Sequence, residues 1–196
     1  SIVFTVNAVN DAPALSSVGD QSTDEDNDLT ISVSASDVDI AENGQSLTFS
    51  LECTGDDDLV ETSCVSTGDT SADCTFDVQD EQNNNDGIDC AIMVDDSNGL
   101  TDDSHFSLSV FPVNDVPVLS SVGDQSTDED NDLTISVLAS DVDIDENGQS
   151  LTFSLECTGD DNLVETSCVS TGDASADCTF DVQDEQNGEV ECAVSV

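Results

Sequence analysis

The feature that most constrains this chain is that it contains nearly the same sequence twice. Residues 11–82 match residues 115–186 at an offset of 104, and only six of the 72 aligned positions differ. The differences are Ala12/Val116, Ala14/Val118, Ser34/Leu138, Ala41/Asp145, Asp58/Asn162 and Thr70/Ala174. Neighbouring repeats this similar predict two copies of one fold, arranged in series as a linear array.

Both ends of the sequence are out of frame with this repeat. Residues 1–10, SIVFTVNAVN, align with residues 105–114, HFSLSVFPVN, and Val196 aligns with Val94. We therefore expect residues 1–10 to be the last strand of a preceding repeat. Residues 11–114 would then form a first repeat, and residues 115–196 a second repeat that lacks its final strand. On this reading the sequence is a window cut from a longer array.

Within each repeat the pattern is that of short β-strands. The segments LTISVSA, LTFSL, CTFDV, CAIMV and FSLSV alternate apolar with polar residues, which is typical of half-buried strands. Turn sequences such as SVGDQ, ENGQ and DSNG separate them,. About seven short strands per repeat, without a helical period, predict an all-β fold of tandem β-sandwiches.

The charge of the chain excludes several classes of partner. The sequence has 46 acidic residues and no Lys or Arg, for a net charge of −46. Nucleic acids and anionic membrane surfaces are bound through Lys and Arg, so we expect neither partner. No apolar run approaches the roughly 20 residues of a membrane span, so we expect no membrane insertion by this segment. Self-repulsion at this charge favours a fold that binds divalent cations.

Eight cysteines fall into two sets of four at matching positions. The sets are Cys53, Cys64, Cys74, Cys90 and Cys157, Cys168, Cys178, Cys192. An even number at repeated spacings predicts disulfides, and therefore an extracellular or cell-surface location. Zinc is the alternative, but no C-x-x-C motif is present and the chain has a single histidine, His105. Four cysteines allow three pairings per repeat, and the spacing does not choose among them.

Two acidic motifs recur in both copies. Asn-Asp stands shortly before proline in AVNDAPAL (8–15) and in PVNDVPVL (112–119), and DVD stands at 37–39 and 141–143. Proline favours an extended backbone before it, so each Asn-Asp pair predicts a stiff junction that carries a carboxylate. If DVD lies on a strand, alternation puts both of its aspartates on one face. Ca²⁺ takes six to eight oxygen ligands from carboxylates, amides and carbonyls, so these motifs predict calcium binding.

In this order the motifs resemble the cadherin-like, Ig-like tandem repeats of bacterial surface adhesins and extracellular filaments. The resemblance rests on VNDAP, DEDNDLTISVSASDVD, GQSLTFSL and IMVDDSNGLTDDSHFSLSVFPVNDVP, and it covers essentially the whole chain. It implies Ca²⁺ at the junctions between repeats. For the junction between the two repeats the implied ligands are Glu25, Asn114, Asp115, Asp141, Asp143 and the backbone carbonyl of Asn147. For the upstream junction they are Asn10, Asp11, Asp37, Asp39, Asn43 and Asp95.

Two further details follow from the same resemblance. The acidic pair that the family carries before its penultimate strand is replaced here by QDEQ, with Asp80 and Glu81, so the number of ions per junction stays open. The resemblance also favours particular disulfides. These are Cys64–Cys74 and Cys53–Cys90, with Cys168–Cys178 and Cys157–Cys192 as their equivalents.

The function that we expect is a structural spacer of an extracellular adhesin or filament, stiffened by calcium at its junctions and by disulfides. Its partners would be neighbouring repeats or identical subunits, and the sequence does not identify a distal adhesion target. In an alternative mode of assembly, SIVFTVN would complete the sandwich of the next subunit and build a strand-exchange filament.

Other functions fit the sequence less well. A module that binds glycan, ice or a mineral surface is the alternative, but the aromatic platforms of glycan sites are represented here only by Phe. DVDIDENG at 141–148 has Asp at the first, third and fifth positions of an EF-hand loop, yet its Gly stands at the eighth position instead of the sixth. We expect no enzymatic activity, because no repeat places a histidine near a nucleophile apart from His105.

Overall fold

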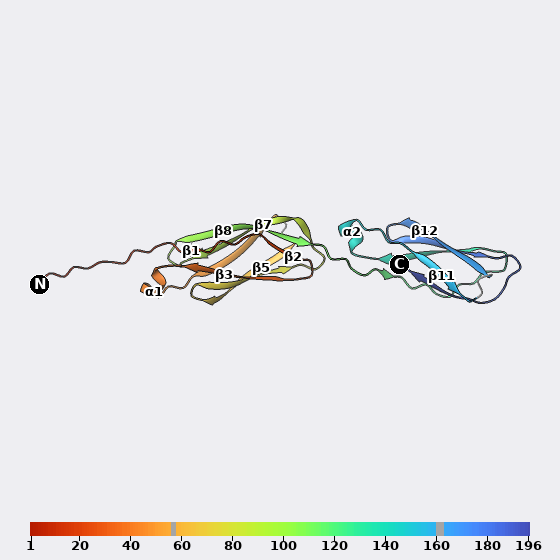
Figure 1. Ribbon diagram of the computed structural model, residues 1–196, viewed down its shortest axis with the longest axis horizontal. Helices are drawn as coiled ribbons and strands as arrows, with labels where there is room; N and C mark the ends of the chain where they lie inside the picture. Colours follow the sequence, from red (N-terminus) through yellow and green to blue (C-terminus); the bar gives the residue numbers. More distant parts are fainter. Residues whose placement is uncertain (56–57, 160–162) are drawn as a thin grey trace. The chain divides into compact units, whose positions relative to one another are not determined.

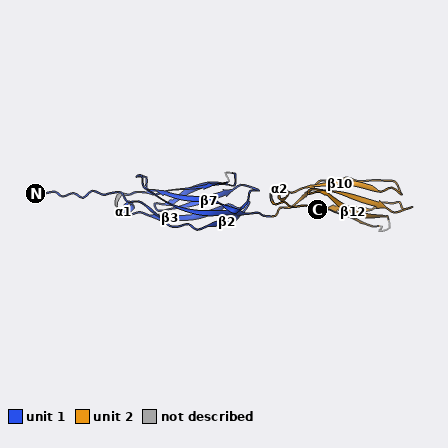
Figure 2. Ribbon diagram, turned by 90° about the horizontal axis from the view of Figure 1, so that it is seen from above, with its two compact units in different colours: residues 1–113 blue, residues 114–196 orange. Residues whose placement is uncertain are grey.

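The computed structural model describes residues 1–55, 58–159 and 163–196, except for the side chains of Glu42, Asn43 and Glu146. The chain divides into two compact units, Ser1–Val113 and Asn114–Val196 (Figure 2). Each unit is an all-β sandwich with one short helix, as the sequence predicts for the fold class. The division falls one residue before the predicted repeat boundary, and the segment 1–10 is grouped with the first unit.

Unit 1 is built from two four-stranded sheets (Figure 1). The first sheet has the order β1-β3-β6-β5 and the second the order β2-β8-β7-β4. Strand β2 pairs with β8 in parallel, whereas the other pairs are antiparallel. The elements are β1 (Ala14–Leu15), β2 (Gln21–Asp24), β3 (Leu29–Ser36), α1 (Asp39–Asn43), β4 (Thr48–Thr54), β5 (Val60–Gly68), β6 (Ser71–Val78), β7 (Asn84–Asp95) and β8 (Thr101–Phe111).

The core of unit 1 lies between these sheets and depends on the alternation of side chains along each strand. On β8 the apolar residues Phe106, Leu108 and Val110 are buried, while the serines between them are partly exposed. Phe106 meets Phe76 of β6 edge to face, with ring centroids 6.1 Å apart. Such aromatic pairs stabilise a core beyond the area that they bury. Strand β8 therefore packs its apolar face against Phe76 of the opposite sheet.

Unit 2 has the same plan with fewer strands. One sheet has the order β12-β13-β10-β9, and the other consists of β11 and β14 alone. The elements are β9 (Val118–Leu119), β10 (Leu133–Ser140), α2 (Asp143–Asn147), β11 (Ser154–Thr158), β12 (Val164–Gly172), β13 (Ser175–Val182) and β14 (Glu191–Ser195). In the described part of unit 2, no strand corresponds to β8. Residues 125–128, QSTD, form no strand either, although they are identical in sequence to β2.

The helices differ from the sequence prediction, which contained strands and turns only. In unit 1 the chain leaves β3 at Ser36, and the Asp37 carboxylate accepts a hydrogen bond from the backbone N–H of Asp39. This contact opens the single turn of α1, which ends at Gly44 in a left-handed conformation with φ of 70°. Glycine adopts this conformation without the steric penalty that other residues pay. A five-residue helix is too short to produce a helical period in the sequence.

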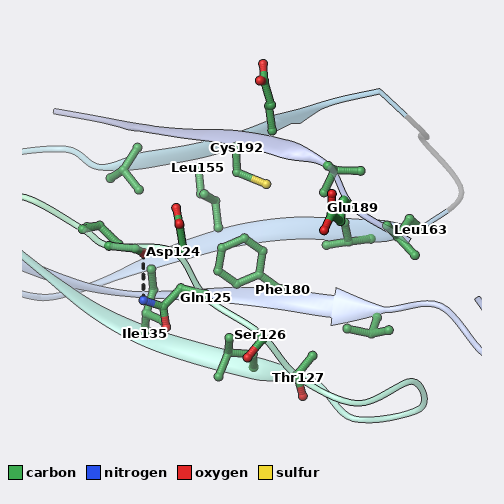
Figure 3. A pocket seen from close by; sticks show the side chains of 18 of the residues that line it. Asp124, Gln125, Ser126, Thr127, Ile135, Leu155, Leu163, Phe180, Glu189 and Cys192 are labelled. Atoms are coloured by element: carbon green, nitrogen blue, oxygen red, sulfur yellow. Dashed lines mark hydrogen bonds between the residues drawn. The ribbon is translucent and has the colours of Figure 1, made fainter. Parts of the chain in front are cut away.

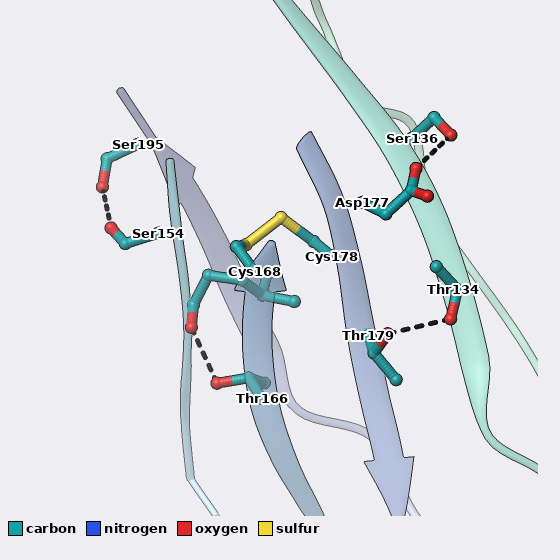
Figure 4. Close-up of a disulfide and its surroundings, with 10 residues drawn as sticks. Thr134, Ser136, Ser154, Thr166, Cys168, Asp177, Cys178, Thr179 and Ser195 are labelled. Carbon is teal, nitrogen blue, oxygen red and sulfur yellow. Dashed lines mark hydrogen bonds between the residues drawn. A yellow bond between two sulfur atoms is a disulfide. The ribbon is translucent and has the colours of Figure 1, made fainter. Parts of the chain in front are cut away.

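All eight cysteines form disulfides, in the pairing that the resemblance favours. Cys53–Cys90 joins β4 to β7 and Cys64–Cys74 joins β5 to β6. In unit 2, Cys157–Cys192 joins β11 to β14 and Cys168–Cys178 joins β12 to β13 (Figure 4). Each disulfide links residues that lie directly opposite each other on neighbouring antiparallel strands. Disulfides of this number are typical of proteins from oxidising compartments.

Candidate functional site

The buried charges of this protein are all carboxylates. Among the described residues, Glu25, Asp39, Asp96 and Asp143 are each exposed by 2% or less, and the chain has no Lys or Arg to pair with them. A buried carboxylate costs free energy unless hydrogen bonds or a cation compensate it. These four acids lie in two kinds of cluster, at opposite ends of a unit.

The N-terminal cluster of unit 1 consists of Asn10, Asp11, Asp37, Asp39, Gln45 and Asp96. In it, the backbone N–H of Asp11 donates to Asp39 Oδ2 at 2.8 Å, and the backbone N–H of Asp39 donates to Asp37 Oδ1 at 2.8 Å. The expectation that both DVD aspartates lie on one face of a strand is wrong, because Asp37 follows β3 and Asp39 begins α1. A tight turn brings them together instead, and it also fixes the backbone of the Asn-Asp motif.

Asp96 completes this cluster, and the sequence analysis missed it. Asn10 Nδ2 donates to Asp96 Oδ2 at 2.5 Å, and Gln45 Nε2 donates to Asn10 Oδ1 at 2.7 Å. The predicted ligand Asp95 is half-buried and accepts a hydrogen bond from the backbone N–H of Ser97. Alternation along β7 could have indicated Asp96, because Ile92 and Val94 face the core and Asp96 continues that face.

Hydrogen bonds hold Asp96 in its charged form. Burial raises the pKa of this carboxyl, but donation from Asn10 and from the backbone N–H groups of Leu100, Asn98 and Gly99 outweighs burial, so the pKa lies below its ordinary value. The resulting contribution to stability is present above the unfolded-state pKa and is lost as the pH falls through the folded-state value. Asp96 therefore carries its charge under neutral conditions.

Two oxygens of the N-terminal cluster have no hydrogen-bond partner among the described residues. They are Asp37 Oδ2 and Gln45 Oε1, and both are buried. Buried polar atoms are nearly always paired, so each unpaired oxygen requires an explanation. Carboxylate and amide oxygens of this kind are ligands that Ca²⁺ accepts.

The donor set suits Ca²⁺ by its chemistry. In the described part of the chain, no group of three or more His, Cys, Asp or Glu side chains is arranged to hold a metal ion. The N-terminal cluster instead mixes carboxylates with the amide oxygens of Asn10 and Gln45. Ca²⁺ accepts this mixture and completes its shell with water and backbone carbonyls, whereas zinc prefers Cys and His.

The corresponding cluster of unit 2 repeats three of these contacts. The backbone N–H of Asp115 donates to Asp143 Oδ2 at 2.7 Å, and that of Asp143 donates to Asp141 Oδ1 at 3.1 Å. Gln149 Nε2 donates to Asn114 Oδ1 at 2.8 Å. Two independent copies of the sequence thus produce one arrangement of the Asn-Asp and DVD motifs.

The sequence analysis also predicts Asn43 and Asn147 as calcium ligands. The side chain of Asn43 lies outside the described residues. Asn147 donates from Nδ2 to Asp143 Oδ1 at 2.7 Å, a contact made by the side chain. Its expected role as a ligand through the backbone carbonyl stays a prediction.

Glu25 belongs to a separate C-terminal cluster of unit 1, together with Asn83 and Val113. Its Oε1 accepts a hydrogen bond from the backbone N–H of Val113 at 2.6 Å, and its Oε2 accepts one from Asn83 Nδ2 at 2.9 Å. Figure 1 shows α1 and β2 at opposite ends of the unit 1 sandwich, so Glu25 lies far from Asp37 and Asp39. The predicted grouping of Glu25 with residues of the second repeat stays a prediction. The Asp80–Glu81 turn lies near this end, where the Glu81 backbone N–H donates to Asp26 Oδ1.

The described residues include no helix that is both long and apolar enough to span a membrane.

No protein-family model matches the sequence, and a search of curated proteins finds no match. Similar solved structures include an endo-fucoidan hydrolase of glycoside hydrolase family 107, with 13% identity and a TM-score of 0.39 over 97% of this chain. They also include a protocadherin gammaB7 EC3-6 cis-dimer, with 14% identity and a TM-score of 0.48 over 94% of this chain. A third is the N-terminal Ig1-2 module of the Drosophila receptor protein tyrosine phosphatase DLAR, with 10% identity and a TM-score of 0.37 over 95% of this chain.

The chain spans 29% of the hydrolase, 47% of the protocadherin and 92% of the DLAR module. Cadherin and Ig-domain tandem repeats are thus among its structural neighbours.

Proposed function

We propose that this chain is a structural spacer of an extracellular adhesin or filament, in which Ca²⁺ bound at the ends of each repeat stiffens the connection between repeats. The observation that carries the proposal is the N-terminal cluster of unit 1. There, buried carboxylates have no cationic side chain nearby, and Asp37 Oδ2 and Gln45 Oε1 have no hydrogen-bond partner among the described residues. In this proposal the chain is not an enzyme, and its partners are neighbouring repeats.

The same carboxylates hold the backbone that connects the repeats. Asp143 accepts the N–H of Asp115, and Glu25 accepts the N–H of Val113, two residues earlier in the chain. A cation bound by Asp141 and Asp143 would therefore also restrict the linker. If Ca²⁺ binds only the aligned arrangement of two repeats, it stabilises that arrangement by mass action.

The net charge supports a cationic partner. Two repeats that share 46 carboxylates and lack any Lys or Arg repel each other across a linker,. Monovalent salt screens this repulsion over a Debye length of about 8 Å at physiological ionic strength. Divalent cations held at the linker would cancel it where the repulsion matters most.

Calcium titration of the full chain tests the proposal. Heat of binding is measured by calorimetry, and the distribution of particle lengths by solution X-ray scattering, in Ca²⁺, in Mg²⁺ and in chelator at one ionic strength. We expect Ca²⁺ alone to bind saturably and to narrow the length distribution. An identical profile in Ca²⁺ and in Mg²⁺ would reduce the effect to charge screening and contradict the proposal.

A single substitution locates the ion. Asp37→Asn removes one ligand and should lower the affinity of the upstream site by about 10-fold or more, as ligand-shell changes do in other metal sites. Asp103→Asn is the matched control, because it removes the same charge from an exposed acid of β8. Equal affinities for the two variants would show that the bound calcium lies elsewhere.

A further inference from the structure

The positions at which the two repeats differ gather at one end of one sheet of unit 2. Three of the six differences put a larger apolar side chain into the second copy: Ala12/Val116, Ala14/Val118 and Ser34/Leu138. A fourth, Thr70/Ala174, removes a hydroxyl group. Val118 lies in β9, Leu138 lies in β10 and Ala174 lies in the turn before β13, whose carbonyl oxygen accepts the backbone N–H of Ala139. Most of the changes between the copies therefore alter one region.

The three larger side chains lie on the outer face of this sheet, which points away from the core and from the pocket in Figure 3. Leu138 is 56% exposed, whereas its two neighbours along β10 are buried. Val118 lies opposite Ser140, the next outward position of β10, and is 66% exposed. Val116, two residues before Val118, is 83% exposed. We call Val116, Val118 and Leu138 the outer patch of unit 2.

The fold does not require the outer patch. Unit 1 forms the equivalent pairing of β1 and β3 with Ala14 opposite Ser36. There the Ser34 and Ser16 hydroxyl groups form a hydrogen bond of 3.2 Å, which leucine at the equivalent position of unit 2 does not make. Beyond Leu138 the outer face of unit 2 is polar, with the hydrogen bonds Thr134–Thr179 and Ser136–Asp177 (Figure 4). The outer patch is thus an apolar addition to a polar face.

Carboxylates border the outer patch. Asp115 directly precedes Val116, and Asp141 directly follows β10. Asp177 faces β10 two positions before Leu138. The chain contains no Lys or Arg to offset these charges. An apolar centre with a polar border is the usual arrangement of a protein–protein interface, and here the border is anionic.

We propose that the outer patch of unit 2 is a docking surface for a protein partner whose contact surface has apolar side chains at its centre and Lys or Arg at its edge. Charge complementarity selects this partner, because basic groups would be attracted to the acidic border and would speed the encounter. A second copy of this chain would bring 46 further carboxylates and no cationic side chain, so it would be repelled. A spacer needs no such surface, and the inference therefore goes beyond the proposed function.

Unit 1 separates the effect of the patch from the effect of charge. The counterparts of the bordering acids are Asp11, Asp37 and Asp73, so the acidic border is present in both units. Attraction by charge alone would direct a basic partner to both units equally. Attraction that also depends on apolar contact would direct it to unit 2.

Binding of a synthetic peptide to the full chain tests the proposal. The probe is a helix-forming peptide of leucine and lysine with the leucines on one face, titrated by calorimetry in Ca²⁺ at physiological salt. The triple variant Val116→Ala/Val118→Ala/Leu138→Ser gives unit 2 the residues of unit 1 without changing the charge. It should weaken binding by about 10-fold or more, which corresponds to about 1.4 kcal/mol. A peptide with serine in place of leucine measures binding by charge alone and should not distinguish the two chains.

The reciprocal variant tests for a gain of binding. Ala12→Val/Ala14→Val/Ser34→Leu transfers the outer patch to unit 1 and should raise the number of tightly bound peptides from one to two. Each variant carries residues that the other repeat already has at the same place, so both should fold. Hydrogen exchange of β3 and β10 in the free chains checks folding. In the complex with the unmodified chain, β9 and β10 should gain protection while β1 and β3 do not.

Four results would overturn the proposal. The first is an absence of saturable binding to the unmodified chain, and the second is equal affinity of the unmodified chain and the triple variant. The third is equal affinity for the leucine and serine peptides, which would reduce binding to charge. The fourth is self-association of the unmodified chain, measured by light scattering, that the triple variant loses, because the occupant of the patch would then be a second copy.

Discussion

The two units have identical residues at 66 of 72 aligned positions, yet they bury those residues differently. QSTD is a strand at 21–24 and no strand at 125–128, and Phe76 is buried where Phe180 is partly exposed. Among the described residues, strand β8 of unit 1 has no counterpart in unit 2. The comparison teaches that local sequence provides the propensity for a strand, while a hydrogen-bonding neighbour decides whether the strand forms.

The largest expected effect comes from weakening β8, which should make unit 1 resemble unit 2. Leu108→Ala removes a fully buried side chain from the centre of this strand. We expect the free energy of unfolding of unit 1 to fall by about 2–5 kcal/mol, as for other buried leucines. Hydrogen exchange followed by mass spectrometry measures this loss of stability, which should appear as reduced protection of the amides of β2 and β7.

Ser109→Ala is the control for that prediction, because Ser109 lies on the opposite face of β8. It should change stability by about 0.5 kcal/mol or less. Similar losses for Leu108→Ala and Ser109→Ala, or a loss in unit 2, would contradict the role that we assign to the inner face of β8.

The next effect concerns the disulfides that hold β7 and β14. In unit 1, β7 is paired with both β4 and β8, whereas in the described part of unit 2 β14 is paired with β11 alone. Removing Cys157–Cys192 by alanine substitution should therefore release β14, at a cost to unit 2 of about 2–4 kcal/mol. Removing Cys53–Cys90 should leave β7 protected through its pairing with β8. Hydrogen exchange of the β7 and β14 amides, measured with and without each disulfide, tests this prediction. An equal loss of protection in the two strands would show that β8 does not anchor β7.

The sequence predicted much of this fold because the repeats carry strong alternation. Four of the five segments identified as strands lie within β3, β6, β7 and β8, and the fifth, LTFSL, begins one residue before β4. The pattern did not reveal α1 and α2, because each is a single turn opened by the DVD aspartate and ended by glycine. It also did not show that identical residues 21–24 and 125–128 would differ, since that difference depends on a strand distant in the sequence.

The candidate site could be predicted in part for a related reason. Asn10, Asp11, Asp37 and Asp39 were identified from motifs that lie near each other in the sequence, and the structure brings them into one cluster. Asp96 was missed because it joins Asn10 across 86 positions. Gln45 was missed because its neighbourhood, ENGQ, indicates a turn and no ligand. Contacts between distant segments are set by how the sheets pack, which alternation along one strand does not specify.

The smallest of these effects compares one carboxylate in two environments. Glu25 accepts hydrogen bonds from Val113 and Asn83 while fully buried, whereas Glu129 is exposed. In Glu25→Gln, an amide N–H₂ group replaces one acceptor oxygen and faces a donor, so unit 1 should lose about 1–3 kcal/mol. Glu129→Gln should change the stability of unit 2 by about 0.5 kcal/mol or less. Hydrogen exchange at increasing urea concentrations measures the stability change of each unit in the two variants.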